Sequence, residues 1–172
     1  EYADYGSSKM RVNDGGYYDA YWGDYYETST NDEVMNRHIE NTLKGVSTFK
    51  VGAEYKVAPG FSVRLGYNYV SPMFSKNGFK DGTLPSYGSY YSSATDYTNW
   101  KATNRITAGF GYATGKWNFD FAYAYSQTDG DFYPFMNYYP GSGEDASFAN
   151  IVDGMKVSNK RNQLLLTVGY KF

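Results

Sequence analysis

The stretch Trp117-Asn118-Phe119-Asp120-Phe121-Ala122-Tyr123-Ala124-Tyr125-Ser126 places an aromatic side chain at every second position. Small or polar side chains occupy the positions between them. Successive side chains of a β-strand point to opposite faces, so this period of two predicts a strand with one aromatic face. About ten residues in a tilted strand are enough to cross a bilayer. The stretch therefore predicts one strand of a membrane-spanning sheet.

The same alternation recurs in four other stretches of about the length that a barrel strand needs. These stretches are residues 49–57, 61–69, 105–112 and 163–172. A shorter strand-like segment, residues 1–5, opens the chain. Together the six segments predict an all-β fold built from antiparallel strands.

The connections between these strands alternate strictly between short and long. Residues 58–60 and 114–116 form tight turns of the kind that Pro and Gly favour. The long connections cover residues 7–46, 71–103 and 127–161. Outer-membrane barrels have short periplasmic turns and long extracellular loops. The pattern therefore predicts such a barrel, with its C-terminus in the periplasm.

The composition agrees with this interpretation and argues against other classes of protein. The 172 residues include 21 Tyr and 11 Phe and carry a net charge of -2. The sequence has no apolar run of about 18 residues, so no transmembrane helix is expected, whereas a barrel strand escapes this test because only alternate residues face lipid. The near-neutral charge gives no reason to expect a nucleic-acid partner. We expect a bacterial outer-membrane location, in contact with the lipid bilayer and lipopolysaccharide.

Six strands are too few to close a barrel, since the smallest single-chain barrels have eight. The chain also begins inside a strand-like segment and shows no signal peptide. We therefore interpret residues 1–172 as the C-terminal six or so strands of a larger transmembrane antiparallel β-barrel. One alternative places two further strands in the loops, within residues 15–26 and 155–162. Another is a soluble β-sandwich, which would have to bury the aromatic faces against a second sheet.

Two parts of the chain resemble known outer-membrane proteins. Residues 162–172 resemble the terminal signal of such barrels, which implies recognition by the barrel insertion machinery through Val168, Tyr170 and Phe172. Residues 47–56, Ser-Thr-Phe-Lys-Val-Gly-Ala-Glu-Tyr-Lys, followed by residues 60–69, Gly-Phe-Ser-Val-Arg-Leu-Gly-Tyr-Asn-Tyr, are more particular. They resemble the FadL-type transporters of long-chain fatty acids and the Bacteroidetes relatives labelled haemin receptors.

The resemblance to FadL-type transporters implies a fourteen-stranded barrel with an N-terminal hatch domain and a side opening toward lipid. It also implies transport of long-chain fatty acids and other hydrophobic compounds. The hatch is not visible in this sequence, so the binding and gating residues of the family are not carried over to it.

The strand faces opposite the aromatic ones carry charged and amide side chains, which are expected toward a polar lumen and not toward lipid. Two roles are open for them. They form cross-strand ion pairs that stiffen the wall, or they line a path for substrate. The predicted lumen-facing residues are Lys50, Glu54, Arg64, Asn68, Arg105 and Asp120.

Aromatic and Met residues also gather in the second and third long connections. So much apolar surface outside the membrane indicates either loops that pack on each other or capture of a hydrophobic ligand. Docking of a partner protein on these loops is a competing interpretation. The predicted capture residues are Phe74, Phe79, Phe132, Phe135 and Met136.

No pattern in the sequence indicates catalysis, a cofactor or a metal. His38 is the only histidine, and it lies in residues 31–43, where Asp32 and Glu33 precede spaced apolar residues typical of a short capped helix. The acidic residues between 129 and 153 match no Ca²⁺-binding loop. We predict a channel, not an enzyme, for passive uptake of hydrophobic small molecules such as long-chain fatty acids. The alternative is a structural or partner-docking barrel without transport activity.

Overall fold

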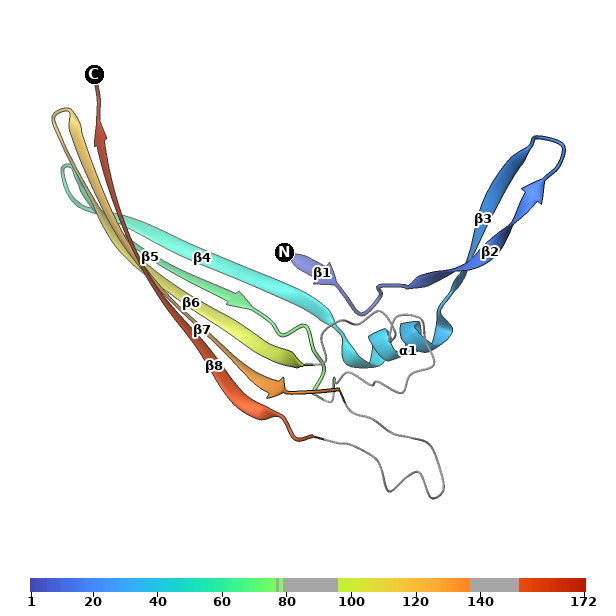
Figure 1. Ribbon diagram of the computed structural model, residues 1–172. Helices are drawn as coiled ribbons and strands as arrows, with labels where there is room; N and C mark the ends of the chain where they lie inside the picture. The colour runs from blue at the N-terminus through green and yellow to red at the C-terminus, as the bar shows by residue number, and fades with distance from the viewer. Residues whose placement is uncertain (77, 79–95, 137–151) are drawn as a thin grey trace.

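The chain folds into one large antiparallel sheet, a separate hairpin and a short helix (Figure 1). The computed structural model describes residues 1–76, 78, 96–136 and 152–172. The six-stranded sheet has the order β1-β4-β5-β6-β7-β8, and β2 pairs only with β3. The elements are β1 (Tyr2–Asp4), β2 (Arg11–Asp19), β3 (Asp24–Asn31), α1 (Glu33–Thr42), β4 (Gly45–Ala58), β5 (Phe61–Val70), β6 (Tyr97–Thr114), β7 (Trp117–Tyr133) and β8 (Met155–Tyr170). The predicted all-β, antiparallel class is confirmed.

The register of the strands brings the alternating aromatic and aliphatic positions onto one face of the sheet. Val63 pairs with Phe110, Phe110 with Phe121, and Phe121 with Leu166. Because the register is constant through this part of each ladder, a step of two residues along every strand leads to another row on the same face. The period of two in the sequence thus becomes one continuous apolar surface across β4 to β8.

This apolar surface is not covered by a second layer of described residues. Leu164 is 71% exposed, Leu166 69% and Leu65 66%. No hydrophobic side chain in the described part of the chain is buried, and the buried side chains there are the polar Asp32, Asn36, Thr42 and Asn99. A soluble β-sandwich buries one face of each sheet against the other. The described residues contain no such packing.

Three strands are longer than the alternation predicted, so the long connections are shorter than expected. β6 begins at Tyr97, β7 ends at Tyr133 and β8 begins at Met155. These strands therefore extend into the ranges 71–103 and 127–161 that the sequence predicts as long connections. In these extensions polar residues occupy both faces, which ends the alternation. The backbone hydrogen bonds between the strands nevertheless continue. Residues 155–162 lengthen β8 and do not form an additional strand.

The first long connection contains regular structure that the sequence did not clearly indicate. Residues 11–31 form the β2–β3 hairpin, which projects away from the large sheet beyond α1 (Figure 1). Aromatic residues lie on both faces of this hairpin, and the register shifts between Asn13 and Gly15. Both features hide its period of two. The candidate strand within residues 15–26 is therefore the tip of a separate hairpin and adds nothing to the large sheet.

The helix predicted within residues 31–43 is confirmed as α1. The Asp32 side chain accepts a hydrogen bond of 3.0 Å from the Met35 backbone N–H, which satisfies one of the free donors at the start of the helix. Leu43 ends the helix in an extended conformation and bridges to Phe74. No helix in the described part of the chain is long and apolar enough to cross a bilayer.

Polar contacts attach the hairpin firmly to the helix. The buried Asn36 side chain accepts from the Met10 backbone N–H at 2.6 Å and donates to the Met10 carbonyl at 3.2 Å. The Asp32 backbone N–H donates to the same carbonyl at 3.0 Å. Lys9 pairs with Glu40, and this hydrogen bond lowers the pKa of the Glu40 carboxyl. The hairpin therefore has a fixed base.

Two tight turns, at the end of the sheet opposite α1 (Figure 1), offer a matched test of the fold. Gly60 (φ +76°) and Gly115 (φ +56°) both adopt a left-handed backbone that costs other residues about 1–2 kcal/mol. A Cβ added to Gly60 would lie 2.2 Å from the Ala113 carbonyl oxygen, whereas one added to Gly115 would meet open space. We expect Gly115→Ala to lose about 1–2 kcal/mol of unfolding free energy, and Gly60→Ala clearly more.

Denaturant unfolding of the two purified variants beside the unaltered protein measures this difference. Equal losses for Gly60→Ala and Gly115→Ala would show that the close approach of Ala113 to the turn is wrong.

Candidate functional site

We call the surface made by residues at alternate positions of β4, β5, β6, β7 and β8 the apolar face. It is bounded at both ends of these strands. At one end the Trp117 and Tyr170 rings lie 4.8 Å apart between centroids. At the other end the hydroxyls of Tyr67 and Tyr123 each donate at 2.7 Å to an asparagine oxygen on the same face. The members are Phe49, Val51, Ala53, Tyr55, Val57, Phe61, Val63, Leu65, Tyr67, Ile106, Ala108, Phe110, Tyr112, Trp117, Phe119, Phe121, Tyr123, Tyr125, Leu164, Leu166, Val168 and Tyr170.

The length of the apolar face along the strands is close to what a membrane-spanning strand needs. From Trp117 to Tyr125 the face covers nine residues of β7. A transmembrane strand tilted by about 45° needs about 9–11 residues. On β6, β7 and β8 the residues of this face beyond Tyr125 become polar, with Gln127 opposite Asn104 and Lys160, whereas the same row on β4 and β5 holds Phe49 and Tyr69. The apolar face therefore ends while the strands continue.

The three residues of the predicted C-terminal signal lie at the opposite limit of this face. Val168 pairs with Phe119, and Tyr170 pairs with Trp117. The Tyr170 and Phe172 rings meet edge to face, with centroids 5.5 Å apart. Phe172 lies beyond the end of β8 and is fully exposed.

The opposite side of the sheet, the polar face, is built around one arginine. Arg64 on β5 donates from Nε to Glu54 Oε2 at 2.5 Å and from Nη1 to Asp120 Oδ1 at 2.6 Å. These carboxylates belong to β4 and β7, so the Arg64 side chain crosses over β6 to reach Asp120. A Cβ at Gly111 on β6 would lie 2.7 Å from Asp120 Oδ1. Glycine at this position leaves the room that the ion pair occupies.

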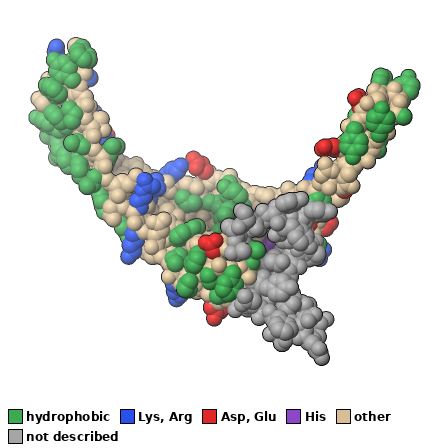
Figure 2. Space-filling model, in the orientation of Figure 1, with side chains coloured by type: hydrophobic (Ala, Val, Ile, Leu, Met, Phe, Trp, Pro, Cys, Tyr) green, Lys and Arg blue, Asp and Glu red, His purple; other side chains and the backbone are tan. Residues whose placement is uncertain are grey.

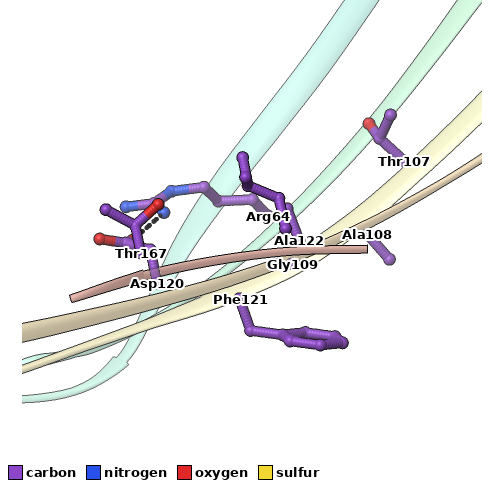
Figure 3. Close-up of a pocket in the computed structure, with 9 residues that line it drawn as sticks. Arg64, Thr107, Ala108, Gly109, Asp120, Phe121, Ala122 and Thr167 are labelled. Atoms are coloured by element: carbon purple, nitrogen blue, oxygen red, sulfur yellow. Dashed lines mark hydrogen bonds and ion pairs between the residues drawn. The ribbon is translucent and has the colours of Figure 1, made fainter. Parts of the chain in front are cut away.

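A hollow of about 200 Å³ adjoins this network (Figure 3). Figure 3 shows Arg64, Asp120 and Thr167 on one side of the strands and Phe121 on the other. The view confirms that neighbouring residues of β7 point to opposite faces, as the alternation predicted. The hollow is open and its lining is mostly apolar, with Ala122 and Leu165 beside Arg64 and Asp120, so it is not an enclosed binding site.

The structure divides the six predicted lumen-facing residues into two groups. Glu54, Arg64 and Asp120 form the network described above. The other three form a row nearer the α1 end of the sheet, where Lys50 pairs with Asn68, and Asn68 with Arg105. Lys50 also makes an ion pair with Glu1 at 3.1 Å. All six residues share the polar face, and four of them take part in ion pairs.

The end of the sheet beside α1 carries a larger groove of about 640 Å³. Aromatic side chains and lysines line it together. Of the five predicted capture residues, Phe74 lines this groove. Phe132, Phe135 and Met136 are half-buried at or just after the end of β7 and do not line it, and Phe79 lies outside the described residues. The lining that matters below is Lys44, Tyr69, Phe74, Trp100, Lys101 and Tyr133.

Sequence reasoning missed most of this groove because its residues come from separate strands. Trp100 precedes a register shift in β6, between the pairs that involve Trp100 and Thr103. Tyr133 stacks on Tyr97, with ring centroids 4.7 Å apart and planes within 11°. Dense aromatics in residues 97–100 and 132–133 were the available signal. Only the antiparallel register shows that these two segments lie side by side.

His38 lies away from the polar face, in a small apolar hollow beside α1. Phe74 and Tyr97 line the same hollow of about 220 Å³. Within the described ranges, no group of three or more His, Cys, Asp or Glu side chains converges as a metal site would. The groups with geometry suited to function are therefore the apolar face, the polar face and the groove.

Comparison with protein-family models, curated proteins and solved structures finds no match to this chain. The geometry must carry the functional argument. The three relevant features are an exposed apolar face, a charged polar face behind it, and an aromatic groove beyond one end.

Proposed function

We propose that this chain forms part of the wall of a bacterial outer-membrane β-barrel that admits hydrophobic small molecules by passive uptake. The observation that carries the proposal is the apolar face. Leaving a Val, Leu or Phe side chain in water instead of burying it costs about 1.5–3 kcal/mol, and the face holds many of them. Lipid is the covering that satisfies a face of this length and this aromatic border.

The polar face supports the same proposal from the other side of the wall. Charged side chains toward lipid are costly, but they are ordinary in the water-filled interior of a barrel. Arg64, Glu54 and Asp120 satisfy one another across four strands. Such a network suits a lumen wall, because it holds neighbouring strands together without presenting an unpaired charge to a hydrophobic ligand.

The ends of the sheet support an orientation. The two tight turns and the C-terminus lie at one end, and α1 lies at the other (Figure 1). Barrels of this class keep short turns in the periplasm and longer structure outside. We therefore place the C-terminus in the periplasm, where Val168, Tyr170 and Phe172 would meet the barrel insertion machinery. The groove would face the exterior, near lipopolysaccharide.

The groove would then gather an apolar ligand before it enters the wall. Burial of an alkyl chain is favourable by about 0.8 kcal/mol per CH₂, so an open aromatic groove is enough for capture. The resemblance of residues 47–56 and 60–69 to FadL-type transporters supports long-chain fatty acids as the substrate class. A purely docking role is the second candidate, and the exposed aromatic residues of the β2–β3 hairpin favour it.

Uptake of a radiolabelled long-chain fatty acid by cells producing the full-length protein tests the proposal. We expect the paired substitutions Phe74→Ser and Trp100→Ser to slow uptake several-fold, because they remove apolar contacts from the groove. The matched control is Phe132→Ser with Phe135→Ser, which removes two aromatic residues outside the groove and should keep most uptake. Equal uptake by all these strains and by a strain lacking the protein would contradict a transport role.

A further inference from the structure

The β2–β3 hairpin displays aromatic side chains that the barrel proposal does not use. Tyr21 is 85% exposed, and Trp22 is 70% exposed, with their rings in edge-to-face contact at 5.0 Å. Tyr17, Tyr18, Tyr25 and Tyr26 are also exposed. Figure 2 shows these hydrophobic groups on an arm that stands apart from the rest of the molecule. Since Asn36 and Asp32 fix its base, the hairpin presents this surface in a defined place.

The charge of the hairpin is as distinctive as its aromatic content. Residues 11–31 contain one arginine and four carboxylates, Asp14, Asp19, Asp24 and Glu27, which gives a net charge of -3. Arg11 lies at the base and donates to the Ser29 carbonyl at 2.6 Å. Every charged side chain in the projecting part of the hairpin is therefore a carboxylate.

Acidic and aromatic groups lie together on one face of the hairpin. Tyr17 and Tyr26 are cross-strand partners with stacked rings 5.5 Å apart, and two residues further on Asp19 directly faces Asp24. Like charges placed opposite each other destabilise a strand pair. The Asp19 carboxylate caps the turn through the Tyr21 and Trp22 backbone N–H groups. No such role accounts for Asp24 among the described residues, so a cation from outside would relieve this repulsion.

We propose that the β2–β3 hairpin is a docking surface for a Lys- and Arg-rich segment of another protein. Its carboxylates would pair with the basic side chains, and its exposed rings would take part in cation–π contacts. The unpaired edges of the two-stranded sheet allow an extended segment to add as a further strand. Anionic lipid headgroups and a second copy of the hairpin are disfavoured, because the same four carboxylates would repel both.

The test is fluorescence anisotropy with the full-length protein in detergent and a labelled ten-residue peptide of alternating Arg and Ser. The key variant is Asp19→Asn with Asp24→Asn, which removes two charges and keeps the acceptor that caps the turn. The control is Glu33→Gln with Asp153→Asn, which removes two exposed carboxylates outside the hairpin. A second variant, Tyr25→Ser with Tyr26→Ser, removes two rings and no charge.

We expect saturable binding that the Asp19/Asp24 variant weakens about tenfold, with a shallower dependence on salt. The tyrosine variant should weaken binding several-fold at an unchanged salt dependence, and the control should bind as the unaltered protein does. If the control weakens binding equally, the effect depends only on the net charge of the protein, and the proposal is overturned. Preference of the hairpin for anionic lipid vesicles or for a neutral oligosaccharide over the peptide would overturn it as well.

Discussion

Leu166→Arg is expected to destabilise the assembled protein by about 2–4 kcal/mol, the cost of a basic residue near the bilayer midplane on the lipid face of a barrel. Leu166 lies in the middle row of the apolar face, paired with Phe121. It is 69% exposed in the isolated chain, so the substitution creates no cavity and no clash with protein. The loss of unfolding free energy therefore reports whether the apolar face contacts lipid or water. Denaturant unfolding of the full-length protein in lipid vesicles gives the value.

The neighbouring residue provides a control of the same type in the same strand. Leu165 is 63% exposed, but it lies on the polar face and lines the hollow that contains Asp120. Leu165→Arg places its charge near a carboxylate and should change the unfolding free energy by about 0.5 kcal/mol or less, as surface substitutions do. Comparable losses for Leu165→Arg and Leu166→Arg would refute the assignment of the two faces.

The second large effect that we expect is in the labelling of intact cells by a membrane-impermeant maleimide. Lys156→Cys should be labelled, and Lys116→Cys should not. Lys156 lies in the part of β8 beyond the apolar face, and Lys116 lies in the turn between β6 and β7. Both side chains are exposed, so reactivity depends on the side of the membrane and not on burial. The 172 residues contain no cysteine, which removes background from this segment.

Lysed cells supply the control for this labelling. Both cysteines should react once the membrane is opened, which shows that neither is hidden by the protein. Labelling of Lys116→Cys alone in intact cells would invert the proposed orientation.

The alternation of the sequence was sufficient to predict the part of the sheet that carries the apolar face. In β7 every second residue from Trp117 to Tyr125 is aromatic, and the structure places all five on the apolar face. Period two is a local property of an extended chain, so it requires no knowledge of the partner strand. The N-terminal cap of α1 at Asp32 was predictable for the same reason.

Two kinds of feature could not be predicted from the sequence: those that depend on strand register, and strand segments with polar residues on both faces. The extension of β7 to Tyr133 has hydrogen-bonding partners but no alternation. The contact of Arg64 with Asp120 spans 56 positions and crosses an intervening strand. The groove joins Phe74 to Trp100 and Tyr133 from three segments. In each case the determining fact is which strands are neighbours, and that is a property of the whole sheet.

The most direct measurement of the central claim, that the apolar face contacts lipid, is the accessibility of spin labels along β8 in reconstituted vesicles. Single cysteines at positions 163 to 168 would each carry a nitroxide, and collisions with oxygen and with a water-soluble nickel complex would be compared. Oxygen dissolves in the bilayer and the nickel complex does not. We predict high oxygen accessibility at Leu164, Leu166 and Val168, and high nickel accessibility at the positions between them. Nickel accessibility at all six positions, without a period of two, would contradict the account.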